Sequence, residues 1–430
     1  MRFIKLLSLS LFLGMFVTAC STNPVTGKRQ FSIISPAQEV AMGKQNYEPY
    51  QQQQGGEYTV DKGLTRYVSS VGQKLAAVSD RKDLPYEFVV LNNDVPNAWA
   101  LPGGKIAINR GLLVMLKDEA QLASVLGHEI VHAAARHGAT QMTNATLLNI
   151  GAQTIGLVTQ NNQYGSLIGI GTNIGAGAWQ ASYGRSQELE SDEYGIEYMV
   201  RAGYDPYAAV ELQEIFLKLS GNRESNFLEA WMASHPPSAQ RVARNKELAA
   251  KYGSGGKRNE QAYARAIAQA KKDQPAYDSN NQAVKAAGQK DFATANSLID
   301  KAIRMQPKEA IFQVTKGQIA LAQNQYSTAE SAFKKANSLN PGYYAGYVGA
   351  GVAQIQQQNI NGAKSSFEKS LKYLPTQTAT FYLGEISLRN NNKQQALEYY
   401  SFAAQGGGEL GAAAQKRVGE LQPAPTTSGQ

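Results

Sequence analysis

Two histidines four residues apart, in His128-Glu129-Ile130-Val131-His132, constrain this chain more than any other feature. In an α-helix that spacing is about 400° of rotation, so both imidazoles leave one face, one turn apart. Neutral histidine nitrogens are common zinc ligands, and Glu129 is placed to take a proton from a metal-bound water. The segment therefore predicts a helix that carries two zinc ligands and a general base suited to peptide-bond hydrolysis.

The flanking residues also predict a helix. Asp118 is a suitable N-cap, and Glu119 follows in the first turn. Leu122, Val125, Leu126 and Ile130 then recur at helical spacing. Arg136, His137 and Gly138 resemble a C-terminal turn, although the helix could also run on. Because His137 is five residues beyond His132, it is turned away from the ligand face. We expect it to be structural or to support a ligand.

A catalytic zinc usually needs a third protein ligand. The acidic run 188–193 opens a second predicted helix, with Ser186 as its cap and Arg201, Gly203 and Pro206 as stop signals. Glu188 and Asp192 share a face, whereas Glu190 points away. They suit a ligand and a partner that orients an imidazole, although a solvated acidic first turn would give the same pattern.

These two patterns together resemble the HtpX-type and CAAX-prenyl-protease-type zinc metallopeptidases, in particular the BepA-like periplasmic lipoprotein branch. The resemblance covers about residues 20–250. Three further segments share it: 23–30 (NPVTGKRQ), 97–104 (NAWALPGG), and 234–238 (SHPPS) with Arg241. It implies a mainly α, gluzincin-like metallopeptidase domain with a small β-sheet and one Zn²⁺ per chain. The zinc would be held by His128, His132 and Glu188, with Glu129 as the general base and Asp192 in the catalytic group.

The segment between Tyr86 and Arg110 predicts a small sheet. Residues 86–91 are rich in β-formers, residues 105–109 alternate, and Pro102-Gly103-Gly104 signals a turn. A strand edge can bind an extended substrate through its main chain, although a hairpin that only supports the core fits equally. The resemblance favours a substrate rim formed by Asn97, Ala98, Trp99, Ala100 and Leu101.

The resemblance gives His235 two possible roles in the site. It would either donate to the oxyanion formed during hydrolysis or occupy the open zinc position and keep the enzyme latent. Arg241 would pair with active-site carboxylates or with the oxyanion.

The first twenty residues predict a lipoprotein signal peptide. Arg2 and Lys5 precede an apolar run too short to span a membrane, and small residues lead to Cys20, the single cysteine. Cys20 would be the lipidated residue. Ser21 follows it, as in lipoproteins of Gram-negative bacteria that are sorted to the outer membrane, so we expect a periplasmic protein anchored to the inner face of that membrane. The net charge of +8 suits anionic surfaces or acidic clients, and nothing accompanies it that indicates nucleic-acid binding.

The last third of the chain repeats with a period of about 34 residues. Matching positions carry small residues (Ala295, Ala329, Ala363, Ala396; Gly317, Gly351, Gly384), prolines (Pro307, Pro341, Pro375) or bulky residues (Ile299, Phe333, Phe367, Tyr400). This pattern is typical of tetratricopeptide repeats, which stack into an α-solenoid with a concave face. Tyr343, Tyr344, Tyr347 and Tyr382 are candidates to line that face, although the array could also only pack against the peptidase domain.

The expected organisation is therefore a signal peptide (1–19), a zinc metallopeptidase domain (20–250), a helical linker (251–275), about four repeats with a capping helix (276–421) and a disordered tail (422–430). Residues 147–177 could be a lid, a membrane-touching hairpin or buried core. We expect a protease in outer-membrane protein quality control that degrades misfolded, stalled or misassembled proteins and could also assist their assembly. The repeats would recruit these proteins or dock on the barrel assembly machinery. The alternative is a chaperone or scaffold with a latent metal site.

Overall fold

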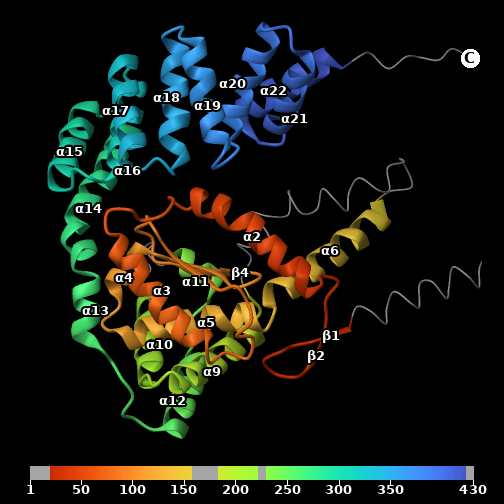
Figure 1. Ribbon diagram of the computed structural model, residues 1–430, viewed down its shortest axis with the longest axis vertical. Helices are drawn as coiled ribbons and strands as arrows, with labels where there is room; N and C mark the ends of the chain where they lie inside the picture. Colours follow the sequence, from red (N-terminus) through yellow and green to blue (C-terminus); the bar gives the residue numbers. More distant parts are fainter. Residues whose placement is uncertain (1–19, 157–182, 221–228, 423–430) are drawn as a thin grey trace, which may run out of the picture. The chain divides into compact units, whose positions relative to one another are not determined.

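A computed structural model describes residues 20–156, 183–220 and 229–422 of the chain. The chain divides into two compact units between Lys271 and Lys272. Helices dominate both, and the small sheets lie in the first unit, so the expected mainly α fold is confirmed (Figure 1). The predicted signal peptide, residues 157–177 of the predicted lid or hairpin, and most of the predicted tail lie outside the described residues.

The first unit combines two small sheets with helices. Strand β1 (Cys20–Thr22) is antiparallel to β2 (Arg29–Phe31). The second sheet has the order β3-β5-β4, with β3 parallel and β4 antiparallel to the central β5. The elements are β3 (Glu87–Leu91), β4 (Ala98–Leu101), β5 (Lys105–Asn109), α2 (Pro36–Gln53), α3 (Lys62–Ala76), α4 (Arg110–Met115), α5 (Glu119–Ala134), α6 (His137–Gly156), α9 (Arg185–Arg201), α10 (Tyr207–Ser220), α11 (Glu229–Ser234), α12 (Ala239–Tyr252) and α13 (Glu260–Ala266).

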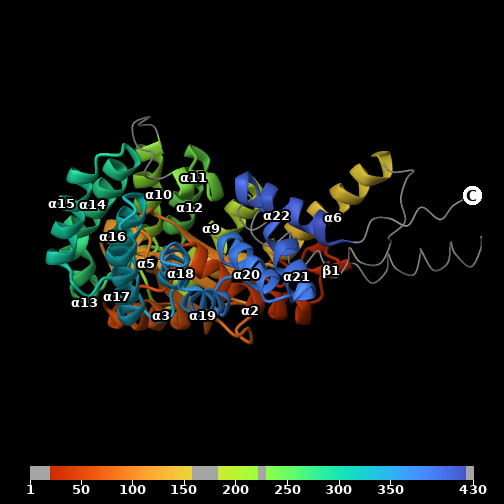
Figure 2. The same cartoon turned by 90° about the horizontal axis from the view of Figure 1, so that it is seen from above.

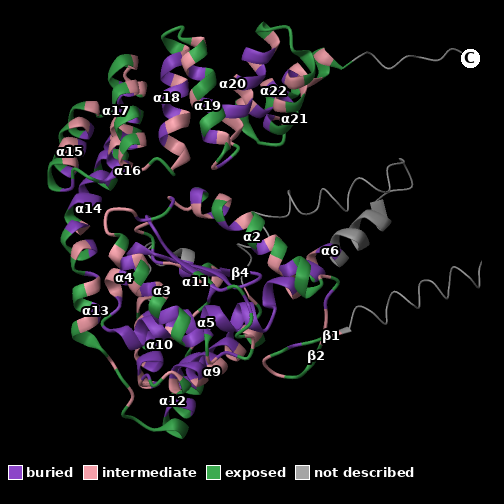
Figure 3. Cartoon of the chain, in the orientation of Figure 1, coloured by how far each residue is buried: buried purple, intermediate pink, exposed green. Residues whose placement is uncertain are grey.

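The helix that carries the two histidines, α5, forms as its flanks predict. The Asp118 side chain accepts a hydrogen bond of 2.8 Å from the backbone N–H of Gln121 and caps the helix. Arg136, at a positive φ of 65°, separates α5 from α6, and its guanidinium donates to Glu39. Nearly every residue of α5 is buried, so this helix is the centre of the unit (Figure 3).

Helix α9 packs directly against α5 because both helices carry a glycine at the crossing. A Cβ atom added to Gly127 would lie 3.0 Å from the carbonyl oxygen of Gly195. This close approach brings the acidic first turns of α9 to the histidine face of α5. The predicted Ser186 cap is wrong, because the helix already begins at Arg185 and its N-cap is Gly184. The backbone N–H of Gly184 donates to the side chain of Gln187.

The three-stranded sheet is held between α2 and the central helix. Trp99 of β4 packs in a core cluster with Tyr47 and Tyr50 of α2, and the Trp99 and Tyr50 ring centroids are 4.7 Å apart. The predicted turn at Gly103 and Gly104 is confirmed, since both glycines have positive φ angles, 74° and 79°. Strand β4 is therefore an edge strand anchored by one aromatic face.

The second unit is a row of paired helices. Its helices are α14 (Ala268–Gly288), which begins in the first unit, α15 (Phe292–Met305), α16 (Ala310–Ala322), α17 (Tyr326–Leu339), α18 (Tyr344–Gln356), α19 (Ile360–Leu371), α20 (Gln377–Arg389), α21 (Lys393–Ala403) and α22 (Gly408–Leu421). Successive pairs lie side by side in both Figure 1 and Figure 2. This is the solenoid that the 34-residue period predicts.

The repeated glycines explain the tight pairing. A Cβ atom added to Gly351 would lie 2.5 Å from the ring of Phe367, and one added to Gly384 would lie 2.7 Å from the ring of Tyr400. Gly317 faces Phe333 in the same way. Each glycine thus makes room for the bulky residue of the following helix, as the period predicts.

Among the described helices, none has both the length and the apolar character needed to cross a bilayer.

Candidate metal centre

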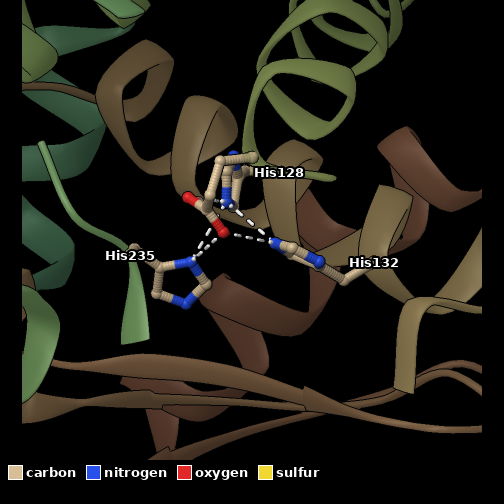
Figure 4. A group of neighbouring side chains, drawn as sticks. His128, His132 and His235 are labelled. Atoms are coloured by element: carbon tan, nitrogen blue, oxygen red, sulfur yellow. Dashed lines mark hydrogen bonds and ion pairs between the residues drawn. The ribbon is translucent and has the colours of Figure 1, made fainter. Parts of the chain in front are cut away.

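Three segments of the first unit bring four potential ligands together. His128 and His132 come from α5, Glu188 comes from the first turn of α9, and His235 directly follows α11. Figure 4 shows the three imidazoles and a carboxylate converging on one point. All four residues are buried, and one ligand atom from each lies within 4.8 Å of the others.

The spacing of these atoms fits a single metal ion. The Nε2 atom of His128 lies 3.0 Å from Nε2 of His132 and 3.2 Å from Nδ1 of His235. The Glu188 carboxylate lies 3.1 Å from His235, 3.4 Å from His132 and 3.5 Å from His128. A tetrahedral zinc with ligands at about 2.0–2.1 Å has edges of roughly 3.3–3.4 Å. The cluster therefore has the size of a four-coordinate zinc site.

Unsatisfied buried oxygens also point to a cation. Both carboxylate oxygens of Glu129 are buried and make no hydrogen bond within the described part of the chain. Buried carboxylates without such partners are costly unless a charge compensates them. The nitrogen and oxygen donors, their spacing and the unsatisfied carboxylate of Glu129 together fit a zinc ion.

The surroundings of His132 and Glu188 lower both pKa values, so that His132 is held neutral and Glu188 is held charged. Burial lowers the pKa of His132 well below its usual value, which favours the neutral imidazole that binds metals. Burial raises the pKa of Glu188, but His235 and His128 outweigh it and lower that pKa well below the usual value. Glu188 therefore stays ionised, as a ligand must.

Asp192 holds His128 from behind. Its Oδ1 lies 3.0 Å from Nδ1 of His128. Arg241 grips the same carboxylate in a bidentate pair, at 2.6 Å and 2.7 Å, and lies 2.8 Å from Glu188. Burial raises the pKa of Asp192, but Arg241 and the hydrogen bonds outweigh burial and lower it. Asp192 thus orients the imidazole through Nδ1 and leaves Nε2 facing the cluster.

Glu129 lies beside the cluster on α5 and is fully buried. Its Oε1 is 3.4 Å from Nε2 of His235. Burial is the main influence on Glu129, and it raises the pKa of this carboxyl. A carboxylate of raised pKa is a stronger base, which suits transfer of a proton from water.

His235 is held by its own short segment. Its backbone N–H donates to the carbonyl of Trp231 at 2.7 Å, and the two rings lie 4.7 Å apart. Since Nδ1 faces the ligands and Nε2 faces Glu129, His235 lies between the metal position and the carboxylate.

The segment expected to form the substrate rim is strand β4 with Asn97 before it. Ala98, Trp99, Ala100 and Leu101 are all buried, and the side chains of Trp99 and Leu101 belong to the core cluster under α2. One main-chain edge of β4 pairs with β5, so the expected substrate rim is reduced to the outer main-chain edge of this strand.

Two contacts near the cluster carry no signal in the sequence spacing. The Tyr183 ring stacks on His132, with centroids 3.7 Å apart and planes at 21°. Glu190, expected to point away from the ligand face, lies 3.2 Å from His137.

Cys20, expected to be lipidated, is the first residue of β1.

Comparison with known proteins agrees with this arrangement. Residues 63–249 match the model of peptidase family M48, and residues 280–344 and 348–409 match a tetratricopeptide repeat. All four cluster residues fall within the first match.

Named relatives share the peptidase part. The chain is 32% identical over 233 residues to a beta-barrel assembly-enhancing protease of Escherichia coli O157:H7, which covers 53% of this chain and 47% of that protein. It is 31% identical over 229 residues to the mitochondrial metalloendopeptidase OMA1 of Schizosaccharomyces pombe, which covers 52% and 65%. The chain thus spans about half the length of the beta-barrel assembly-enhancing proteases that it matches. Residues 63–249 are therefore a domain of peptidase family M48, and tetratricopeptide repeats follow it in the same chain.

Proposed function

We propose that the chain is a zinc metalloendopeptidase. The observation that carries this proposal is the buried cluster of His128, His132 and Glu188 with the unsatisfied carboxylate of Glu129 beside it. Relatives named as metalloendopeptidases and proteases support it. A chain that served only as a scaffold would have no use for a buried carboxylate in this position.

His128, His132 and Glu188 would hold the zinc. When bound, zinc supplies a Lewis acid that lowers the pKa of water and polarises the scissile carbonyl. Glu129 takes the proton of the attacking water and returns it to the leaving amine. Asp192 and Arg241 keep the His128 imidazole oriented.

His235 is compatible with both of the expected roles. With Nδ1 among the ligands, it would occupy the fourth position and exclude water, which is a latent state. Once displaced, the imidazole would remain within reach of the reacting carbonyl and could donate to the oxyanion. The two roles would then belong to two positions of one short segment that follows α11.

We further propose that the substrates are misassembled outer-membrane proteins in the periplasm of a Gram-negative bacterium. The name of the Escherichia coli relative supports a role connected with β-barrel assembly. The repeats would recruit such proteins or dock on the assembly machinery, since these arrays usually bind proteins. Lipidation of Cys20 would hold the enzyme at the outer membrane.

Fragments of outer-membrane proteins in the native envelope test this function. Wild type, Glu129→Gln and a deletion are compared, with Glu247→Gln as an exposed control. We expect fragments in the wild type and the control and none in Glu129→Gln. Identical fragments in wild type and Glu129→Gln, together with a deletion phenotype, would favour the chaperone or scaffold function instead.

A further inference from the structure

His137 stands directly behind the second histidine ligand. Its Nδ1 lies 2.9 Å from Nδ1 of His132, and the two ring centroids are 5.0 Å apart. His137 is 2% exposed, so water does not compete for this contact. On its other side, Nε2 of His137 lies 3.2 Å from Oε1 of Glu190.

The chain of contacts continues to the N-terminal segment. The side-chain amide of Asn23 donates to the same Glu190 oxygen at 2.7 Å, across 167 residues of sequence. Asn23 is itself 5% exposed and is fixed by a tight turn. Its Oδ1 accepts the backbone N–H groups of Val25 and Thr26 at 2.9 Å and 3.2 Å. The amide nitrogen is therefore aimed at Glu190 by the hairpin between β1 and β2.

Hydrogen-bond chemistry allows one arrangement of protons along this chain when a metal is bound. His132 must present a bare Nε2 to the metal, so its proton is on Nδ1. That proton is donated to His137, which must then be bare at Nδ1 and protonated at Nε2. The Nε2 proton points at the Glu190 carboxylate, which accepts it together with the amide of Asn23.

The other ligand histidine is supported in a parallel way. Nδ1 of His128 meets Asp192 directly, and Arg241 holds that carboxylate. Nδ1 of His132 meets His137, and His137 links it to the carboxylate of Glu190. His128 is therefore linked to Asp192, which Arg241 holds, and His132 is linked through His137 to Glu190, which Asn23 holds.

We propose that His137, Glu190 and Asn23 form a relay of positioning residues that sets the tautomer and orientation of His132, which makes the N-terminal hairpin part of the metal centre. The relay rests on the proposed zinc site. Its members touch neither substrate nor metal and act through His132 alone.

Zinc affinity measured by competition with a chromophoric chelator tests the relay. The purified full chain is compared with His137→Ala, His137→Asn and Glu190→Gln. We expect His137→Ala to weaken zinc binding about 10- to 100-fold. His137→Asn should recover part of the loss, because Asn keeps an acceptor near the position of Nδ1. Glu190→Gln should fall between wild type and His137→Ala, and Glu193→Gln on the exposed face of α9 should match wild type.

The outer end of the relay has its own pair of variants. Asn23→Ala should weaken zinc binding several-fold. Thr26→Ala in the same turn should not, because the Thr26 hydroxyl accepts the backbone N–H of Lys28, and the backbone N–H that Thr26 donates to Asn23 is kept in the variant. Thermal unfolding of the metal-free proteins separates affinity from folding. A merely structural relay would lower the melting temperature of the metal-free variants and leave zinc affinity within about twofold of wild type, which would overturn the proposal.

Histidine tautomers give a readout independent of affinity. The chain holds only four histidines, so ¹⁵N-labelled imidazoles can be assigned individually in the zinc-loaded protein. We expect His132 protonated at Nδ1 and His137 protonated at Nε2. A proton on Nδ1 of His137 would contradict the relay. If wild type itself binds no zinc, the proposed function fails; if wild type binds zinc and the variants bind equally well, only the relay fails.

Discussion

Nδ1 of His235 lies 3.2 Å from Nε2 of His128, the separation expected of two nitrogens that share one zinc ion. The protein itself thus supplies a group at all four corners of the site. A catalytic zinc needs one corner for water or substrate. In the proposed zinc site, His235 would fill this corner, and its departure from Glu188 would open the site.

Replacing His235 by alanine should open the site. We expect His235→Ala to cleave an unfolded protein several-fold faster, because water gains the fourth position. X-ray absorption at the zinc edge should change from three imidazoles to two. Pro237→Ala, in the same loop, is the control. Slower cleavage would show instead that the oxyanion role of His235 outweighs its blocking role.

Removing Arg241 should destabilise the metal-free protein more than the zinc-loaded protein. This guanidinium is buried and pairs with Asp192 and Glu188, which would be left as uncompensated buried charges. Breaking such a pair costs about 3–5 kcal/mol. We expect urea unfolding of metal-free Arg241→Met at lower concentration than wild type, and excess zinc should restore part of the difference. An unchanged unfolding midpoint would contradict the role given to Arg241.

Much of this arrangement follows from local pattern in the sequence. Asp118 marks the start of α5 because capping is a local interaction, and Gly351 predicts close packing because its period matches that of Phe367. The spacing of Glu188 and Asp192 on one helix face likewise indicates two roles at one site. Periodicity and capping depend only on nearby residues, so they can be read without a fold.

The parts that escaped prediction depend on contacts between distant segments. Glu190 points away from the ligand face of its own helix, and only the fold brings His137 and Asn23 to it. The stacking of Tyr183 on His132 has the same origin. The N-cap at Gly184 escaped because a glycine cap acts through its backbone, whereas Ser186 offered a hydroxyl that the fold does not use.

Acid should weaken the start of α5, the helix that carries His128 and His132, through Glu119. This carboxylate accepts hydrogen bonds from Tyr67, Tyr204 and Asn259. Burial raises the pKa of Glu119, but the hydrogen bonds outweigh it and lower the pKa below the usual 4.5. Its contribution to stability is therefore present above about pH 4.5 and is lost as the pH falls through the lowered value.

The variant Glu119→Gln should show this pH dependence. At pH 7 we expect it to be less stable than wild type by about 1–3 kcal/mol, since charge-assisted hydrogen bonds are lost. The difference should shrink below pH 4.5, where wild type loses the same charge. Urea unfolding at several pH values measures both. A stability difference independent of pH would show that the Glu119 charge is not responsible.

The repeats should not tolerate a side chain at Gly351, where one helix packs against the Phe367 ring of the next. Gly351→Ala would place a methyl group 2.5 Å from the Phe367 ring, and overpacking of this kind costs about 1–3 kcal/mol. Gly419→Ala, with nothing within 4 Å, is the matched control and should be neutral or stabilising. Calorimetry should show a lower transition for Gly351→Ala only, with zinc content unchanged. Equal melting in the two variants would contradict the packing role of Gly351.

Glu129 provides the most direct test of the proposed zinc peptidase. Zinc content and cleavage of one unfolded protein are measured side by side for wild type and Glu129→Gln, each with and without a chelator. We expect about one zinc per chain in both proteins, cleavage by wild type that the chelator abolishes, and a loss of roughly 10²–10⁴-fold in Glu129→Gln. Cleavage by wild type that survives the chelator, or by Glu129→Gln at the wild-type rate, would contradict the account.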